Sequence, residues 1–140
     1  LGSGVFRMGN HESWVDNKGA GGIACQVDGA GVMKAYGIDK HLNKHDSHPA
    51  TGHRFGCELP SVVAAISMVT SLHERLPHFD LVSWDVAIDC KGDPVLVELN
   101  VVDQEINFHQ AGGTPLFGAD TPEVVQQLSH RRATMSMVQY

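Results

Sequence analysis

The stretch WDVAIDCKGDPVLVELN, residues 84–100, predicts two β-strands joined by a tight turn. Residues 81–89 and 95–100 each alternate between apolar and polar side chains, which is the period of a strand with two different faces. Between them, Lys91 and Gly92 supply a two-residue turn. The stretch therefore predicts an antiparallel hairpin, and its apolar side chains favour a central place in a sheet.

The length of this loop decides which residues face each other across the hairpin. A two-residue loop, or a four-residue loop over the same turn, places Asp85 opposite Glu98 and Asn100 opposite Ser83. Side chains opposed in this way have Cβ atoms about 4.5–5.5 Å apart, and two carboxylates there repel each other unless a cation lies between them. The amide oxygen of Asn100 adds a third oxygen ligand on the same face, a set suited to Mg²⁺ or Mn²⁺. The alternative interpretation is a solvated hairpin face with two unrelated acids.

The composition places the chain among ordinary globular domains. Its 140 residues suffice for a single domain, and 42% of them are apolar, near the globular average. The net charge of −6 and the scattered Lys and Arg residues argue against nucleic acid as a main partner. No apolar run approaches the roughly 20 residues that a membrane-spanning helix needs. Three cysteines without a CxxC pair, and no signal peptide, favour reduced thiols and a cytoplasmic location.

The other predicted elements complete an α+β domain around this hairpin. Both predicted strand pairs have short turns, so we expect a largely antiparallel sheet with helices packed on one side. The polar segment 38–57 is expected to be a surface loop. It contains four histidines, but no cysteine or acid completes a known zinc spacing, and we expect no bound metal there. The expected strands are 5–8, 22–28, 32–36, 81–89 and 95–100, and the expected helices are 59–76, 104–110 and 121–135.

Five short motifs resemble the sugar-transfer-associated ATP-grasp family. The likeness extends over residues 5–128. D-alanine–D-alanine ligases and ribosomal-protein glutamate ligases belong to the same superfamily. The motifs are VDN at 15–17, GG at 21–22, HPATG at 48–52, SWD at 83–85 and ELN at 98–100.

The resemblance implies roles for the hairpin acids and for one arginine. In ATP-grasp enzymes an Asp, a Glu and an Asn hold the Mg²⁺ ions that bridge the ATP phosphates, which implies Asp85, Glu98 and Asn100 as metal ligands. Arg7, on the first predicted strand, is the candidate catalytic residue, because a guanidinium can contact the transferring phosphate through two hydrogen bonds. The alternative for Arg7 is an ordinary surface arginine on a strand.

Two further groups of residues are candidates for nucleotide and substrate contacts. Asn17, Gly21 and Gly22 are the nucleotide-binding candidates, because glycines let backbone amides approach phosphates, although a plain loop would have the same composition. His109 and Gln110 follow the hairpin, where related enzymes hold the acceptor substrate. Many of those enzymes have a Pro- and Gly-containing loop after the metal-binding Asn. This chain has VVDQ there, so its substrate pocket is expected to differ.

The resemblance implies that residues 1–140 form the C-terminal catalytic lobe of an ATP-grasp ligase. Such enzymes use Mg-ATP to phosphorylate a small-molecule carboxylate, and an amine then displaces the phosphate. The nearest family implies a link to polysaccharide or cell-surface biosynthesis. The alternative is a non-catalytic ATP-grasp-like module that binds a nucleotide or a partner.

The chain is also expected to be part of a longer protein, since it begins with LGSG and enters a predicted strand at once. In the family, N-terminal lobes supply the adenine pocket and the lysines that hold the α- and β-phosphates. Those lobes are the expected partners, and this chain alone is expected to fold without binding Mg-ATP tightly.

Overall fold

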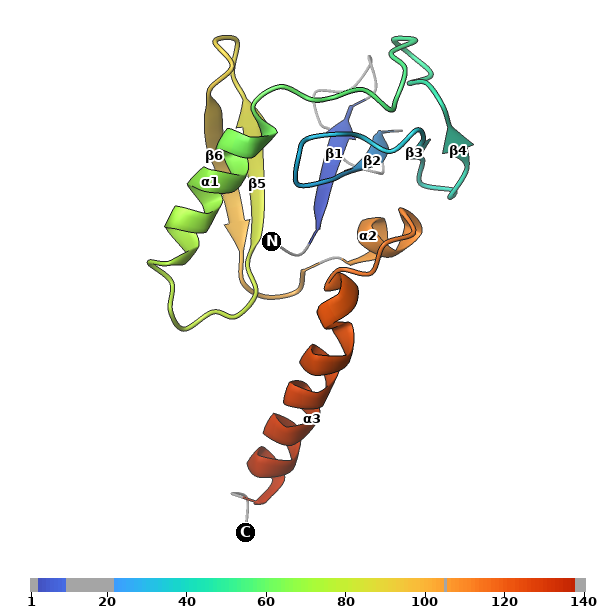
Figure 1. Ribbon diagram of the computed structural model, residues 1–140. Coiled ribbons are helices and arrows are strands. Elements are labelled where there is room, and N and C mark those ends of the chain that lie inside the picture. The colour runs from blue at the N-terminus through green and yellow to red at the C-terminus, as the bar shows by residue number, and fades with distance from the viewer. Residues whose placement is uncertain (1–2, 10–21, 105, 138–140) are drawn as a thin grey trace.

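The strands and helices of the chain are arranged around two β-sheets (Figure 1). The computed structural model describes residues 3–9, 22–104 and 106–137. The strands are β1 (Gly4–Met8), β2 (Ile23–Val27), β3 (Gly37–Ile38), β4 (Lys44–His45), β5 (Ser83–Ile88) and β6 (Pro94–Asn100). The helices are α1 (Val62–His73), α2 (Asn107–Ala111), the 3₁₀ turn η2 (Gly118–Asp120) and α3 (Thr121–Met137). None of the described helices is long and apolar enough to cross a membrane.

Both sheets are antiparallel, which confirms the predicted α+β class. One has the strand order β1-β2-β3-β4, and the other consists of β5 and β6 alone. The organising hairpin therefore forms a sheet of its own among the described residues, where a central place in one sheet was expected. In Figure 1 it lies beside β1, with α1 packed across it.

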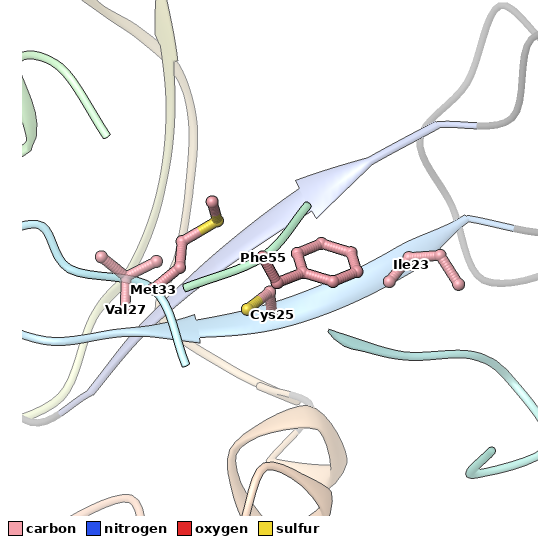
Figure 2. Close-up of a cluster of buried hydrophobic side chains, with 5 residues drawn as sticks. All are labelled: Ile23, Cys25, Val27, Met33 and Phe55. Atoms are coloured by element: carbon pink, nitrogen blue, oxygen red, sulfur yellow. The ribbon is translucent and has the colours of Figure 1, made fainter. Parts of the chain in front are cut away.

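The hydrophobic core is built on one face of β2, all five residues of which are buried. Ile23, Cys25 and Val27 point to this face, as the two-residue period of a strand requires. Met33 and Phe55 pack against them (Figure 2). Partly buried apolar side chains from β1 and from the segment entering α1 close the cluster: Phe6, Met8, Leu59 and Val62.

The opposite face of β2 carries the polar residue Gln26 and is not part of the hydrophobic core. Gln26 is only 7% exposed and lies on this face with Ala24. Antiparallel pairing places Val5 opposite Gln26 and Arg7 opposite Ala24, so Arg7 and Gln26 share one face of the sheet. The core thus covers one face, and the other carries the arginine selected from the sequence.

The predicted strand 32–36 is wrong in its extent. Only an isolated bridge joins Met33 to Val27, and regular pairing with β2 begins at β3. The pairing with β2 is interrupted because the Val32 backbone pairs instead with Glu58, in the segment before α1. The turn itself agrees with the glycine-rich sequence, since the Asp28 carboxylate accepts hydrogen bonds from the Ala30 and Val32 amides, each at 2.9 Å.

Segment 38–57 lies largely on the surface, as its polarity predicted, but it is not a plain loop. It contains the β3–β4 hairpin, and Phe55 from its end belongs to the core. His48 is 2% exposed, and its Nδ1 accepts a hydrogen bond from the Thr51 amide at 3.3 Å, which confirms a turn at the HPATG motif. The sequence did not predict this ordered structure. Hydrogen bonds to polar side chains hold the segment together, and such bonds produce no apolar periodicity.

Asp39 organises the β3–β4 loop through both of its carboxylate oxygens. One oxygen accepts from the amides of His41 and Asn43 at 2.8 and 2.9 Å. The other lies 2.9 Å from the Asn43 side-chain nitrogen and 3.0 Å from His45 Nε2. The hydrogen bonds from Asn43, and then from His45, hold the pKa of Asp39 well below its ordinary 3.8.

This lowered pKa predicts how the Asp39→Asn variant responds to acid. A carboxylate whose pKa falls on folding stabilises the protein above about pH 4 and loses that contribution as the pH falls further. Urea unfolding should therefore show Asp39→Asn to be less stable than the wild type at pH 7, with the difference shrinking towards pH 3. An equal difference at both pH values would show that the charge of Asp39 has no part in stability.

Helix α1 begins later than predicted, and η2 directly precedes α3. Helix α1 starts at Val62, because Ser61 before it has a left-handed backbone (φ 63°) and donates its hydroxyl to the Gly92 carbonyl at 2.6 Å. This bond ties the start of α1 to the turn of the β5–β6 hairpin. Helix α3 begins at Thr121, whose hydroxyl donates to the Gly118 carbonyl at 2.8 Å, and η2 runs directly into the helix. Helix α3 extends away from the sheets (Figure 1).

Candidate active site

The β5–β6 hairpin has the cross-strand pairs that the sequence predicted near its open end. Asp85 lies opposite Glu98, and Ser83 lies opposite Asn100. Residues directly opposite in an antiparallel pair point to the same face, so the two acids and the amide share one side of the hairpin. The predicted pairing is therefore confirmed.

The predicted loop, however, is wrong. The Asp89 amide donates to the Asp93 carbonyl at 3.0 Å, which leaves a three-residue loop in place of two or four. The Asp89 carboxylate accepts from the amides of Lys91 and Asp93 at 2.8 and 2.9 Å, and Gly92 takes a positive φ of 88°. An aspartate at the start and a left-handed glycine at the end are typical of three-residue hairpin loops. Asp89 is therefore a turn residue.

A β-bulge restores the predicted register further along. The pairing shifts between Asp85 and Val86, because Val97 is an extra residue on β6. The bulge also exchanges the faces of the residues nearer the turn: Val95 joins the Asp85 face and Leu96 the Trp84 face, the reverse of the uniform alternation we expected. The loop and the bulge each move the register by one residue, and their effects cancel at Asp85.

Arg7 connects the two sheets at this point. Its Nη2 donates to Asp85 Oδ2 at 3.2 Å, and the two side chains are 37% and 38% exposed. Arg7 comes from β1 and Asp85 from β5, which are separated by 78 positions in the sequence. The structure thus brings the catalytic candidate to the metal-ligand candidates, and a cation already lies against one of two opposed carboxylates.

The other face of the hairpin has a different environment. Trp84 points to this side, where its ring lies 6.2 Å from that of His73 on α1. A cavity of about 520 Å³ opens there between α1, β5 and the start of α3, with Phe117 and Val124 in its lining. Because successive strand residues face opposite ways, this cavity lies on the side of the hairpin away from the acids.

His109 and Gln110 lie on α2, which packs against β1. The Gln26 amide nitrogen lies 3.5 Å from the His109 carbonyl, which places α2 on the same face of the sheet as Arg7. His109 is half-buried, and burial lowers its pKa, so the ring is neutral at pH 7. Its buried Nδ1 has no hydrogen-bond partner among the described residues. Gln110 is exposed.

The comparison with known families agrees with this geometry. A family model described as sugar-transfer associated ATP-grasp matches residues 2–124. The chain belongs to this ATP-grasp family. Its members are generally ligases that typically bind ATP and Mg²⁺. The search of curated proteins and the search of solved structures each found no match.

Of the nucleotide-binding candidates of this ATP-grasp chain, the structure describes Gly22. Asn17 and Gly21 are outside the described residues. Gly22 is buried and directly precedes β2, next to the core residue Ile23. Any contact that Gly22 makes with a phosphate would therefore be through its backbone.

The sequence did not reveal the polar network that holds α2 in place. Thr114 donates its hydroxyl to Gln26 Oε1 at 3.0 Å, and Lys34 Nζ donates to Thr114 at 3.2 Å and to the Gly112 carbonyl at 2.5 Å. A Cβ on Gly112 would lie 2.9 Å from the Gln26 side chain, so glycine at this position allows the close approach seen here. The available signal was the polar Gln26 between two core residues of a strand.

The histidines of segment 38–57 meet other ligand types only in pairs among the described residues: His45 lies 3.0 Å from Asp39, and His53 lies 3.6 Å from Cys57. No group of three or more His, Cys, Asp or Glu that could hold a metal occurs within residues 3–9, 22–104 and 106–137. The metal-ligand candidates from the sequence remain Asp85, Glu98 and Asn100, which share one side of the hairpin.

Proposed function

We propose that this chain is the Mg-ATP-binding catalytic lobe of a ligase that joins a carboxylate to an amine, in polysaccharide or cell-surface biosynthesis. The observation that carries the proposal is the meeting of Arg7 and Asp85 at 3.2 Å, with Glu98 directly opposite, in a chain of the ATP-grasp family. These residues come from two sheets and three strands. Their convergence supports an active site better than a solvated hairpin face.

The residues present fit Mg²⁺ or Mn²⁺. Two carboxylates and an amide on one face form the hard oxygen set that these ions prefer, and Mg²⁺ keeps several waters when few protein ligands are available. The guanidinium at Asp85 shows that the hairpin already favours positive charge at this position. Asp85, Glu98 and Asn100 would hold the metal, which supplies charge neutralisation for the β- and γ-phosphates.

The proposed reaction has two steps. A carboxylate oxygen of the substrate attacks the γ-phosphorus of ATP, the bond to the β-phosphate oxygen breaks, and ADP leaves. The amine nitrogen then attacks the acyl carbon, loses a proton, and phosphate departs with the electron pair of the C–O bond. Arg7 would contact the transferring phosphoryl group, for which a guanidinium has the right donor geometry.

We place the carboxylate and the amine beside α2. Helix α2 and Arg7 lie on the same face of the four-stranded sheet, which supports His109 and Gln110 as substrate residues. The neutral ring of His109 can serve as a hydrogen-bond partner without adding a competing positive charge. Asn17, Gly21 and Gly22 would contribute backbone contacts to the nucleotide, and N-terminal lobes of the same protein would complete the cleft.

A cytoplasmic setting, where ATP is present and thiols stay reduced, is part of this proposal. The three cysteines are free. Burial raises the pKa of Cys25 to about 11, so its thiol stays protonated and unreactive within the core. Cys57 and Cys90 are exposed and are also free thiols.

The experiment is to trap the acylphosphate in the protein that contains this chain. With Mg-ATP, a panel of sugar acids and amino acids, and hydroxylamine as the nucleophile, we expect hydroxamate to form together with ADP. Omission of Mg²⁺ or of the carboxylate should abolish both products. ADP release that is equally fast without any carboxylate would contradict a ligase and indicate a simple ATPase.

A further inference from the structure

The contact between Arg7 and Asp85 has a consequence for how a metal could enter. We propose that Arg7 biases metal binding at the hairpin towards a metal–phosphate complex: it neutralises Asp85 in the empty site and moves to the phosphate when a metal–nucleotide complex binds. The inference rests on the proposed function and names a specificity determinant within the same site. The residue would make the hairpin select a metal–phosphate complex over the bare metal ion.

The charges of the three groups lead to this behaviour. Asp85 and Glu98 face each other, and the Arg7 guanidinium cancels part of their repulsion. A bare divalent ion would have to approach carboxylates whose charge the guanidinium already offsets. A guanidinium attracts a phosphate as strongly as a carboxylate, so Arg7 can exchange Asp85 for another anion that comes close. A polyphosphate chain beside the metal supplies that anion.

The geometry permits the movement. Arg7 and Asp85 are each more than a third exposed, and an ion pair so exposed is weak enough to exchange. Arg7 is anchored on β1, whose hydrogen bonds run to β2, whereas Asp85 is held by the β5–β6 ladder. The guanidinium can therefore change partner without breaking a hydrogen bond of either sheet.

The test compares two probes, Mn²⁺ alone and the complex of Mn²⁺ with inorganic tripolyphosphate, by water-proton relaxation enhancement. In Arg7→Gln, Mn²⁺ alone should bind about three- to tenfold more tightly than in the wild type, because a nearby positive charge is gone. The Mn²⁺–tripolyphosphate complex should bind more weakly by a similar factor. Arg7→Lys, which keeps the charge, should resemble the wild type for Mn²⁺ alone.

A double variant shows whether the effect passes through Asp85. If Arg7 acts on Mn²⁺ through this carboxylate, the Arg7→Gln change should have little effect on Mn²⁺ affinity once Asp85→Asn is present. Thermal unfolding followed by circular dichroism verifies that each variant is folded.

The outcomes separate this inference from the function on which it rests. Equal or weaker Mn²⁺ binding by Arg7→Gln would overturn this role of Arg7, while Mn²⁺ binding weakened but still measurable in Asp85→Asn would still support the metal site. Absence of Mn²⁺ binding in the wild type and in every variant would overturn the metal site itself, and the inference with it.

Discussion

Replacing Glu98 by Gln is expected to lower ATP turnover of the protein at least about 100-fold, because one of two opposed metal ligands loses its charge. The Gln side chain has nearly the same shape, so the hairpin should still form. Steady-state ADP release with the carboxylate substrate measures the effect, and raising Mg²⁺ or Mn²⁺ should recover part of the lost rate. That recovery is the signature of a weakened ligand.

A matched control is available on α3. Glu123→Gln makes the same chemical change at an exposed acid that accepts a hydrogen bond from Gln127 on the same helix, at 3.3 Å. Its turnover should equal that of the wild type. If Glu98→Gln also keeps full activity at low Mg²⁺, Glu98 is no metal ligand and the assignment of the hairpin fails.

Gly37→Ala is expected to have the largest effect on stability. A Cβ at Gly37 would lie 2.4 Å from Ile23 Cγ2 and 2.8 Å from Phe55 Cζ, both within the core. Such overpacking forces side chains out of their rotamers or moves a strand, which costs about 1–3 kcal/mol, and more where neither can relax. Urea unfolding should show a loss of about 3 kcal/mol, because two core side chains are displaced at once.

Gly29→Ala provides the control for backbone entropy. A Cβ at Gly29 meets nothing within 4 Å, so this variant should be as stable as the wild type or slightly more stable. Equal stability of the two variants would contradict the packing of β3 against Ile23 and Phe55.

The cross-strand pairing of the hairpin was predictable because apolar and polar residues alternate along both strands. The apolar period located β5 and β6, and Asp85 was correctly placed opposite Glu98. The reasoning behind the register was nevertheless incomplete. The three-residue loop and the Val97 bulge each shift the strand register by one residue. Neither changes the pattern of apolar residues, so the sequence predicted neither of them.

The features that the sequence did not predict depend on tertiary contacts. His48 and Gln26 are polar residues that the fold buries, and their partners lie in turns or in distant segments. The contact of Arg7 with Asp85 joins two sheets that do not share a hydrogen-bonded ladder. Strand pairing and helix periodicity are local or nearly local patterns, whereas the relative placement of two sheets depends on packing between them.

The resemblance to a family contributed the functional roles of residues, which strand and helix patterns alone do not predict. It singled out Arg7 from a strand of otherwise ordinary composition, and the structure then placed that residue at Asp85. It also assigned substrate roles to His109 and Gln110, which remain predictions. The structure adds that α2 lies on the Arg7 face of the sheet.

The measurement that most directly tests the central claim is paramagnetic broadening of the NMR spectrum of this chain by Mn²⁺. At substoichiometric Mn²⁺, we predict that the amide resonances of Ser83, Asp85, Glu98 and Asn100 broaden first, and that Asp85→Asn removes the effect. Broadening centred on the histidines of segment 38–57, or spread evenly over all surface acids, would contradict a divalent-cation site on the β5–β6 hairpin.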